Sequence, residues 1–343
     1  MRLLTNLTGC PPRLTVPQGH QVEIVYARSW PQFKAQLNTA DVILIECGNN
    51  LMYRVAAYYA VRPWLPKFLV VADLVLRKPL TPLARASAIA KRRLLTQVDH
   101  FIHFFRDVGG YARYFGITAE RSSYVPFKVN AWGDVPSSLA FSEEYVFAAG
   151  VSLRDYHSFV RAIGELGVPA AMSEYAFSNF ERPKGAAAIS RENLPANLTL
   201  LPDSASQGDF LTALARAKLV VIPTLKHSIC ASGISTYLDA MYLGKCVIVS
   251  EGPGASDVLT DQAVLVPSED YAALRDAIRT AWNDDALRRR VALAGRAYAL
   301  SLGGKAEMAR RLIDAAVAAK LGVSEQSEAD GKPQYRRAGA NVG

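Results

Sequence analysis

The stretch from Lys218 to Asp257 constrains the possible fold more than any other part of the chain. Two short apolar runs, Leu219–Ile222 and Cys246–Ser250, flank an apolar segment of helical length at Thr236–Leu243. Short continuous Val and Ile runs are typical of parallel strands that are covered on both faces. The stretch therefore predicts a strand, a helix and a second strand of an α/β protein with a doubly wound parallel sheet.

The entry of this helix is a candidate binding site. Ser232, Gly233, Ile234 and Ser235 stand where peptide N–H groups have no intrahelical acceptor, at the positive end of the helix dipole. A glycine there lets an anion approach the backbone, so we expect a phosphate group to bind. The structural alternative is that Ser232 is only the N-cap of the helix.

Asp239, further along the same helix, is a second candidate. A carboxylate at this depth can accept hydrogen bonds from a ribose diol, as acidic residues do in other nucleotide-binding α/β units. The alternative is a solvated carboxylate on the helix surface.

The motifs that follow resemble a known family. The segments ISTYLDAMYLGKCVIVS, EGPGASDVL and AVLVPSEDYAALRDAIRTAWNDDALRRRVALAGR are similar to the C-terminal half of GT-B glycosyltransferases of the retaining family four type. That family shows two glutamates separated by seven residues, followed by an Ala-Met-x-x-Gly-x-Pro-Val-Ile run. Asp239 stands at the second acidic position, and Gly244, Val247 and Ile248 match the run. The first acidic position is Ala231, so half of this signature is absent.

The resemblance implies the GT-B fold, in which two Rossmann-like, doubly wound domains face a cleft. Residues 1–135 are expected to form the acceptor-side domain and residues 136–304 the domain that binds the nucleotide-sugar donor. Residues 305–321 are expected to form a helix that crosses back to the first domain. Residues 322–343 are polar and glycine-rich, and we expect them to be disordered.

The first half of the chain has the alternation of strands and helices that is typical of a parallel α/β sheet. Its apolar runs, with helical segments between them, are Val22–Tyr26, Asp41–Glu46, Phe68–Ala72 and His100–Phe105. The segment Thr8–Gln21 leaves no room for the long first helix of the resembling family. The second half has the same alternation, and residues 131–144 are expected to link the two.

A second set of donor contacts is expected after the strand Tyr145–Ala149. A helix is predicted to begin within Gly150–Tyr156 and to run to about Leu166. In the resembling family this loop supplies an arginine for the donor diphosphate, at the position that is Val151 here. The resemblance therefore moves this catalytic and donor-binding role to Arg154, in the first helical turn.

Lys226, in the loop before the helix entry, is a further candidate contact to the donor. The structural alternative for Arg154 is pairing with nearby carboxylates.

Asp73 ends the apolar run KFLVVAD, and Arg77 and Lys78 follow in the same loop. Functional side chains of α/β proteins lie just outside the carboxyl ends of the strands. In the resembling family this strand end faces the cleft near the reacting carbon. We therefore expect Asp73 to activate or position the acceptor, and Arg77 and Lys78 to contact acceptor phosphates. A turn or helix cap is the alternative for Asp73.

The net charge of +8 is unevenly distributed. Residues 1–135 contain 17 Lys and Arg against 8 Asp and Glu, a net charge of +9, whereas the remainder contains 22 against 23, a net charge of −1. Such a domain attracts an anionic surface or substrate. No stacking aromatic residues or recognition motif accompanies this charge, so no nucleic-acid partner is expected.

The segment Pro82–Thr96 predicts a basic amphipathic helix in which Ala84, Ala88, Ile89 and Leu95 share an apolar side. Such a helix can lie on anionic lipid, where each Lys or Arg contributes about 1 kcal/mol. The alternative is an ordinary surface helix packed on the sheet, which the mostly alanine apolar side favours.

The four cysteines, at positions 10, 47, 230 and 246, show no Cys-x-x-Cys pairing, and the five histidines show no metal-binding spacing. We therefore expect reduced thiols and no metal site. No apolar run is long enough to span a bilayer, and no signal peptide is evident. These features predict a cytoplasmic protein, peripheral to the inner membrane face if the basic helix binds lipid.

The leading functional hypothesis is a glycosyltransferase that moves a sugar from a nucleotide-diphosphate donor to a saccharide or lipid-linked acceptor, with retention of configuration. The resemblance implies a role in cell-surface or extracellular polysaccharide synthesis, with no cofactor besides the donor substrate. Two alternatives stay open. One is a GT-B-like binding or scaffold protein without transfer activity, motivated by Ala231 and Val151. The other is a sugar-nucleotide epimerase of similar architecture.

Overall fold

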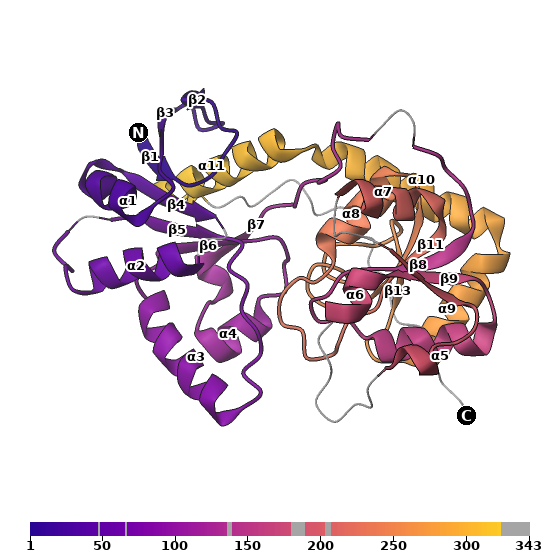
Figure 1. The fold of residues 1–343 in the computed structure, drawn as a ribbon. Coiled ribbons are helices and arrows are strands. Elements are labelled where there is room, and N and C mark those ends of the chain that lie inside the picture. Colours follow the sequence, from indigo (N-terminus) through magenta and orange to yellow (C-terminus); the bar gives the residue numbers. More distant parts are fainter. Residues whose placement is uncertain (47–48, 66, 136–138, 180–188, 203–206, 324–343) are drawn as a thin grey trace, which may run out of the picture.

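The computed structural model describes residues 1–46, 49–65, 67–135, 139–179, 189–202 and 207–323. Cys47, part of the expected linker and residues 324–343 of the expected tail lie outside these ranges. The described chain forms two lobes, each built on its own parallel sheet (Figure 1). The prediction of two Rossmann-like doubly wound units is confirmed.

The first lobe contains a seven-stranded sheet in the order β2-β3-β1-β4-β5-β6-β7. All neighbouring strands are parallel except β2, which is antiparallel to β3. The strands are β1 (Arg2–Thr5), β2 (Arg13–Thr15), β3 (Gln21–Tyr26), β4 (Val42–Glu46), β5 (Leu69–Ala72), β6 (His100–His103) and β7 (Ser122–Tyr124). The helices are α1 (Trp30–Gln36), α2 (Asn49–Ala60), α3 (Pro82–Leu95) and α4 (Gly109–Phe115).

The second lobe contains a six-stranded, all-parallel sheet in the order β10-β9-β8-β11-β12-β13. Its strands are β8 (Tyr145–Ala148), β9 (Ala170–Ser173), β10 (Leu198–Leu201), β11 (Ala217–Ile222), β12 (Cys246–Ser250) and β13 (Val264–Val266). The helices are α5 (Tyr156–Leu166), α6 (Glu174–Asn179), α7 (Gln207–Arg216), α8 (Ile234–Tyr242), α9 (Tyr271–Asn283) and α10 (Asp285–Leu302). A further helix, α11 (Lys305–Leu321), returns to the first lobe (Figure 1).

The two faces of the first sheet are covered in different ways. Successive strand residues point to opposite faces, so Leu4 and Val71 pack among α1–α4, whereas Leu3 and Val70 pack on the other side. That other side is covered by α11, which contacts β4 and β6. Its buried residues recur at helical spacing, as expected of an amphipathic helix whose apolar side faces the sheet.

The connection between β1 and β3 explains why α11 is needed. It contains the short strand β2 and no helix, in line with the expectation that Thr8–Gln21 leaves no room for a long helix. A parallel sheet is stable only when both faces are covered. The end of the chain therefore covers a face of the first lobe.

Two chain segments cross between the lobes side by side. The N–H group of Val129 donates a 3.0 Å hydrogen bond to the carbonyl of Gly303. A Cβ on Gly304 would lie only 2.7 Å from the Trp132 ring, so the indole packs directly on that backbone. We call residues 129–132 the first crossing and residues 303–304 the second crossing.

Two local expectations were wrong. The helix after β8 begins at Tyr156, with Asp155 as its N-cap, so Arg154 precedes the helix instead of lying in its first turn. On α3, Ala88 and Leu95 are buried, but Ile89 lies on the outer side with 62% of its surface exposed. Among the described residues, no helix is long and apolar enough to cross a membrane.

Candidate functional site

The entry of α8 is formed around a glycine in the left-handed region. Gly233 is the N-cap, with φ +94°. A Cβ there would lie 2.5 Å from Cγ2 of Ile222 and 3.2 Å from Nη2 of Arg154, so no other residue fits without strain. The N–H groups of Ile234 and Ser235 follow at the positive end of the helix, where no intrahelical acceptor is available.

The guanidinium of Arg154 lies directly beside this entry. Only 3% of Arg154 is exposed. Its Nε donates to the carbonyl of Ala149 at 3.0 Å, and its Nη1 donates to the carbonyl of Ser152 at 3.0 Å and to Oγ of Ser232 at 2.6 Å. All of its partners among the described residues are uncharged, which does not support the alternative that it pairs with carboxylates.

Burial lowers the pKa of Arg154 from its usual value, because desolvation disfavours the charged form. A buried cation that has no counter-ion and lies next to a helix N-terminus would be stabilised by a bound anion.

Gly150 completes the arrangement on the other side of the guanidinium. It has φ +96°, and a Cβ on it would lie 2.5 Å from Nη2 of Arg154. The sequence offered a signal for this role, since a glycine directly after a buried strand is typical of phosphate-binding loops. We call Gly150, Arg154, Ser232, Gly233 and the first N–H groups of α8 the anion cradle.

The anion cradle lies at the switch point of the second sheet. β8 and β11 are adjacent, and the strands on either side of them continue in opposite directions from this pair. Ligands of open α/β sheets bind outside the carboxyl ends of the strands at such a point. The loops after the two strands are joined here by a bridge between Arg154 and Thr224.

Lys226 borders a different hollow. Its backbone N–H donates to the carboxylate of Glu269 at 3.1 Å. A hollow of about 320 Å³ lies beside it, lined by Leu225, Lys226, Ser228, Glu251, Gly252, Pro267 and Ser268. None of the anion-cradle residues lines this hollow. A contact between Lys226 and the donor stays a prediction.

Asp73 lies directly after β5, at the carboxyl edge of the first sheet. It has φ +55°, a conformation that Asp tolerates better than most residues. Asp73 and Arg77 both influence the thiol of Cys230, which comes from the second lobe. Burial is the main cause that raises the pKa of this thiol. The structure thus brings Asp73 and Arg77 to the boundary between the lobes, with the half-buried Lys78 next in the chain.

The loop before α8 packs against the first lobe at this boundary. Cys230 is 4% exposed and belongs to the core of the first lobe. A Cβ on Gly110 would lie 2.6 Å from Cβ of Ile229, so α4 and this loop are in close contact. Ala231, at the position of the missing acidic residue, would be 2.7 Å from a Cβ on Gly254.

A carboxylate from the second lobe closes a further contact between the lobes. Oδ2 of Asp257 accepts hydrogen bonds from the backbone N–H groups of Arg106 and Asp107, at 2.6 and 2.7 Å. Its Oδ1 accepts from the N–H of Gly254 at 2.6 Å. No motif in the sequence singled out Asp257, because its partners are backbone groups 150 and 151 positions away.

Asp239 does not line the anion cradle. Its Oδ1 accepts a 2.9 Å hydrogen bond from the N–H of Ala131, and the backbone of Asn130 is a further donor. Only 4% of Asp239 is exposed, so it is not the solvated surface residue of the alternative. Burial raises its pKa to about 6, although both backbone hydrogen bonds and Lys128 oppose that shift. A contact with ribose stays a prediction.

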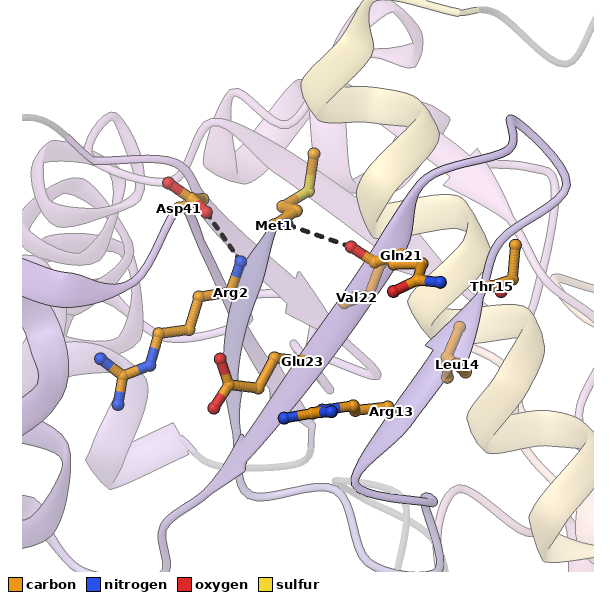
Figure 2. Close-up of a pocket in the computed structure, with 9 residues that line it drawn as sticks. All are labelled: Met1, Arg2, Arg13, Leu14, Thr15, Gln21, Val22, Glu23 and Asp41. Atoms are coloured by element: carbon orange, nitrogen blue, oxygen red, sulfur yellow. Dashed lines mark hydrogen bonds between the residues drawn. The ribbon is translucent and has the colours of Figure 1, made fainter.

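A larger hollow, of about 650 Å³, lies in the first lobe (Figure 2). It is found at the amino ends of β1 and β3, whereas the anion cradle and Asp73 lie at carboxyl ends. Arg2, Arg13, Glu23 and Asp41 are the charged side chains that line it. Oppositely charged residues on neighbouring strands account for this surface through cross-strand pairing, with Glu23 opposite both Arg2 and Arg13.

In the described part of the chain, no three side chains of the types that bind metals lie together. The groups that the anion cradle offers to a ligand are a guanidinium, a hydroxyl and peptide N–H groups.

Comparison with solved structures identifies the fold. HepE of Anabaena, in complex with UDP and glucose, has a TM-score of 0.60 and 15% identity, covering 87% of this chain and 86% of that chain. Sucrose-phosphate synthase from Thermosynechococcus elongatus has a TM-score of 0.60 and 14% identity, with coverages of 92% and 87%. A UDP-forming α,α-trehalose-phosphate synthase from Burkholderia vietnamiensis has a TM-score of 0.58 and 15% identity, with coverages of 85% and 74%.

Residues 186–298 match the family model of glycosyl transferases group 1. The match spans α8 and the motifs on which the resemblance rests. No curated protein sequence matches the chain significantly. The chain therefore has the GT-B fold, and residues 186–298 of its second lobe match the model of glycosyl transferases group 1.

Proposed function

We propose that the protein is a retaining glycosyltransferase that binds a nucleotide-diphosphate sugar in its second lobe and transfers the sugar to a saccharide or lipid-linked acceptor. The observation that carries this proposal is the anion cradle. Arg154 is buried at the entry of α8, between two glycines whose missing Cβ atoms leave it room, and it has no carboxylate partner within the described ranges of the chain. A diphosphate would supply the negative charge that this site lacks.

The solved neighbours support a nucleotide-sugar donor. HepE structures contain UDP, UDP-glucose, or UDP with glucose.

The proposed chemistry places the main catalytic effect on the leaving group. When the bond between the anomeric carbon and the diphosphate breaks, negative charge develops on the phosphate oxygens. Fixed donors in a dry site stabilise that charge more than water does, because they need no reorganisation during the reaction. Arg154 and the N–H groups of Ile234 and Ser235 would act in this way, joined by the hydroxyl of Ser232 once it turns from the carbonyl of Ser152 to the phosphate.

The acceptor would approach from the first lobe. Asp73 is proposed to position or activate the acceptor hydroxyl, and Arg77 and Lys78 to contact its phosphates. Contacts such as those of Asp257 and Ile229 bring the lobes together, which would exclude water from the reacting atoms.

Binding of the donor can be tested by a thermal-shift screen with UDP, GDP, ADP and their sugar conjugates, followed by titration calorimetry. At least one nucleotide diphosphate should stabilise the wild type and bind at least about tenfold more weakly to Arg154→Gln, since a charged hydrogen-bond partner contributes about 1.5–3 kcal/mol. Arg289→Gln is the matched control, because that side chain is 80% exposed. Stabilisation of both variants by the same ligand, with equal affinity, would place the nucleotide elsewhere.

A second candidate function is a nucleotide-sugar-binding protein without transfer activity. It is favoured by Ala231, which cannot supply the missing carboxylate, and by the packing of the neighbouring Ile229 and Cys230 against the first lobe. Donor-dependent stabilisation without hydrolysis of the donor or transfer of its sugar would select this candidate.

We further propose that the acceptor is anionic and that the first lobe works at the anionic inner face of a membrane, within cell-surface or extracellular polysaccharide synthesis. The sequence between Leu74 and Val98 contains six basic residues and no acidic residue. On α3, Leu83 and Ile89 are 81% and 62% exposed, beside exposed Arg85 and Arg93. Apolar side chains among cations suit a surface of anionic lipid.

A further inference from the structure

α8 contacts two functional parts of the molecule with its two halves. Its first residues form part of the anion cradle. Asp239 and Tyr242, later in the same helix, contact the first crossing between the lobes. The helix has nine residues, so at about 1.5 Å per residue its ends are roughly 13 Å apart. A helix this short moves as a rigid body.

Asp239 holds the backbone of the first crossing. Its carboxylate receives the N–H of Ala131 and a further hydrogen bond from the backbone of Asn130. A carboxylate can only accept hydrogen bonds, on either oxygen, whereas an amide side chain would turn a donor toward one of these N–H groups. Among the described residues, the charged side chain that influences Asp239 is that of Lys128. Lys128 in turn interacts with Glu46 and Lys305.

An aromatic contact beside Asp239 connects α8 to the second crossing as well. The rings of Trp132 and Tyr242 lie 5.5 Å apart between centroids, tilted by 32°. The same indole packs on the backbone of Gly304, and Val129 is hydrogen-bonded to Gly303. One helix therefore holds the point at which both crossings meet.

We propose that α8 couples occupancy of the anion cradle to the arrangement of the two lobes, with Asp239 as the positioning residue that holds the first crossing. An anion bound in the anion cradle attracts the N-terminus of α8. The contacts of Asp239 and Tyr242 with the first crossing transmit the resulting movement of the helix. The identity of the anion as a nucleotide diphosphate rests on the proposed function. The contact of Asp239 with the first crossing does not depend on it.

The hydrogen bonds between Asp239 and the first crossing can be tested on the full chain without ligand, by hydrogen exchange of the Asn130 and Ala131 amides. Compared with the wild type, Asp239→Asn should exchange about tenfold faster at these amides, the effect of losing one charge-assisted hydrogen bond. The exposed loop variant Asp261→Asn is the control and should leave their exchange unchanged. Equal exchange in Asp239→Asn and the wild type would overturn the proposal.

A pH series separates this role from general loosening of the fold. After correction for intrinsic exchange, protection of the two amides in the wild type should weaken as the pH falls through about 6, since protonation of Asp239 weakens its acceptors. The Asp239→Asn profile should be flat in this range. Because Glu46 also interacts with Lys128, Glu46→Gln should retain the wild-type profile. A flat wild-type profile would contradict the role of Asp239. So would a pH dependence that is lost in Glu46→Gln but kept in Asp239→Asn.

The coupling is tested with whichever of UDP, GDP or ADP stabilises the wild type. That nucleotide should slow exchange at Asn130 and Ala131 and reduce the radius of gyration of the wild type. Asp239→Asn should bind it within about threefold of the wild-type affinity but show neither response. A parallel loss of affinity of about tenfold or more would assign Asp239 to ribose and overturn the proposal, as would binding to the wild type without either response.

If none of the three nucleotides binds, the proposed function fails. The exchange measurements without ligand still decide whether Asp239 holds the first crossing.

Discussion

Nη1 of Arg154 donates a 2.6 Å hydrogen bond to Oγ of Ser232, and this contact joins the loop after β8 to the entry of α8. Ser232 in turn donates to the carbonyl of Ser152 at 2.8 Å. The two residues are 78 positions apart in the chain. Their contact holds the buried guanidinium of Arg154 at the entry of α8.

Ser232→Asp should abolish nucleotide binding while preserving the fold. A carboxylate at this position would form an ion pair with Arg154 and neutralise the positive charge that binds the diphosphate. Ser232→Asn is the control, since it has a similar size and no charge. We expect calorimetry to show at least about a hundredfold loss of affinity for Asp, in line with about 3 kcal/mol for a charged partner, and a much smaller loss for Asn. Equal losses would show that the charge of Arg154 is not what binds the ligand.

The stability of Asp239→Asn relative to the wild type should depend on pH. Because the folded protein raises the pKa of Asp239 from 3.8 to about 6, it binds this proton more tightly than the unfolded chain does. The wild type therefore loses stability as the pH rises from about 4 to above 6, and the variant lacks this loss.

Urea unfolding should show the free energy of unfolding of Asp239→Asn, relative to the wild type, rising by on the order of 2–3 kcal/mol between pH 4 and pH 7.5. A constant difference across this range would mean that Asp239 titrates normally.

Gly110→Ala should disturb the contact between the lobes, because the added Cβ would lie 2.6 Å from Cβ of Ile229. Overpacking of this kind costs about 1–3 kcal/mol. Ile229→Gly removes the opposing Cβ and Cγ2, so the double variant should recover most of the loss caused by the clash. A double-mutant cycle by urea unfolding, with the radius of gyration measured in parallel, checks this. Strictly additive effects would indicate that the two residues do not meet in solution.

Ile313→Ala should destabilise the first lobe although it lies near the end of the chain. Ile313 is fully buried in α11, against the face of the first sheet that has no crossover helix of its own. Truncation of such a residue costs about 2–5 kcal/mol. The measurement is urea unfolding followed by tryptophan fluorescence, with the exposed Arg310→Ala as control. A loss no larger than that of the control would mean that α11 is dispensable for this lobe.

Vesicle binding should depend on the outer face of α3. Co-flotation with phosphatidylglycerol vesicles is expected for the wild type and reduced several-fold for the double variant Arg85→Gln/Arg93→Gln and for Leu83→Ser. Each cation near an anionic surface contributes about 1 kcal/mol. Arg289→Gln/Arg290→Gln, in the second lobe, removes the same charge and should float like the wild type. Equal reduction in both double variants would reflect net charge instead of a docking face.

Much of the fold could be predicted from local patterns. Buried parallel strands such as β5 and β12 are continuous apolar runs, because both faces of the sheet are covered. The helix entry at Gly233 was predicted because a glycine before an apolar helix lets an anion approach the unpaired N–H groups. β9 could not be predicted in this way, since the run Ala170–Ser173 has few of the branched residues typical of strands.

The sequence by itself determined two lobes, their parallel sheets and a glycine at the entry of α8, because these depend on residue types within a few positions of each other. Only the tertiary structure decided the rest. It placed Arg154 outside its helix and beside Ser232, turned Asp239 to the amides of Asn130 and Ala131, and made α11 the cover of the first sheet. These contacts join backbone groups and side chains that are distant in the chain, and no local pattern encodes which backbone group a carboxylate or guanidinium meets after folding.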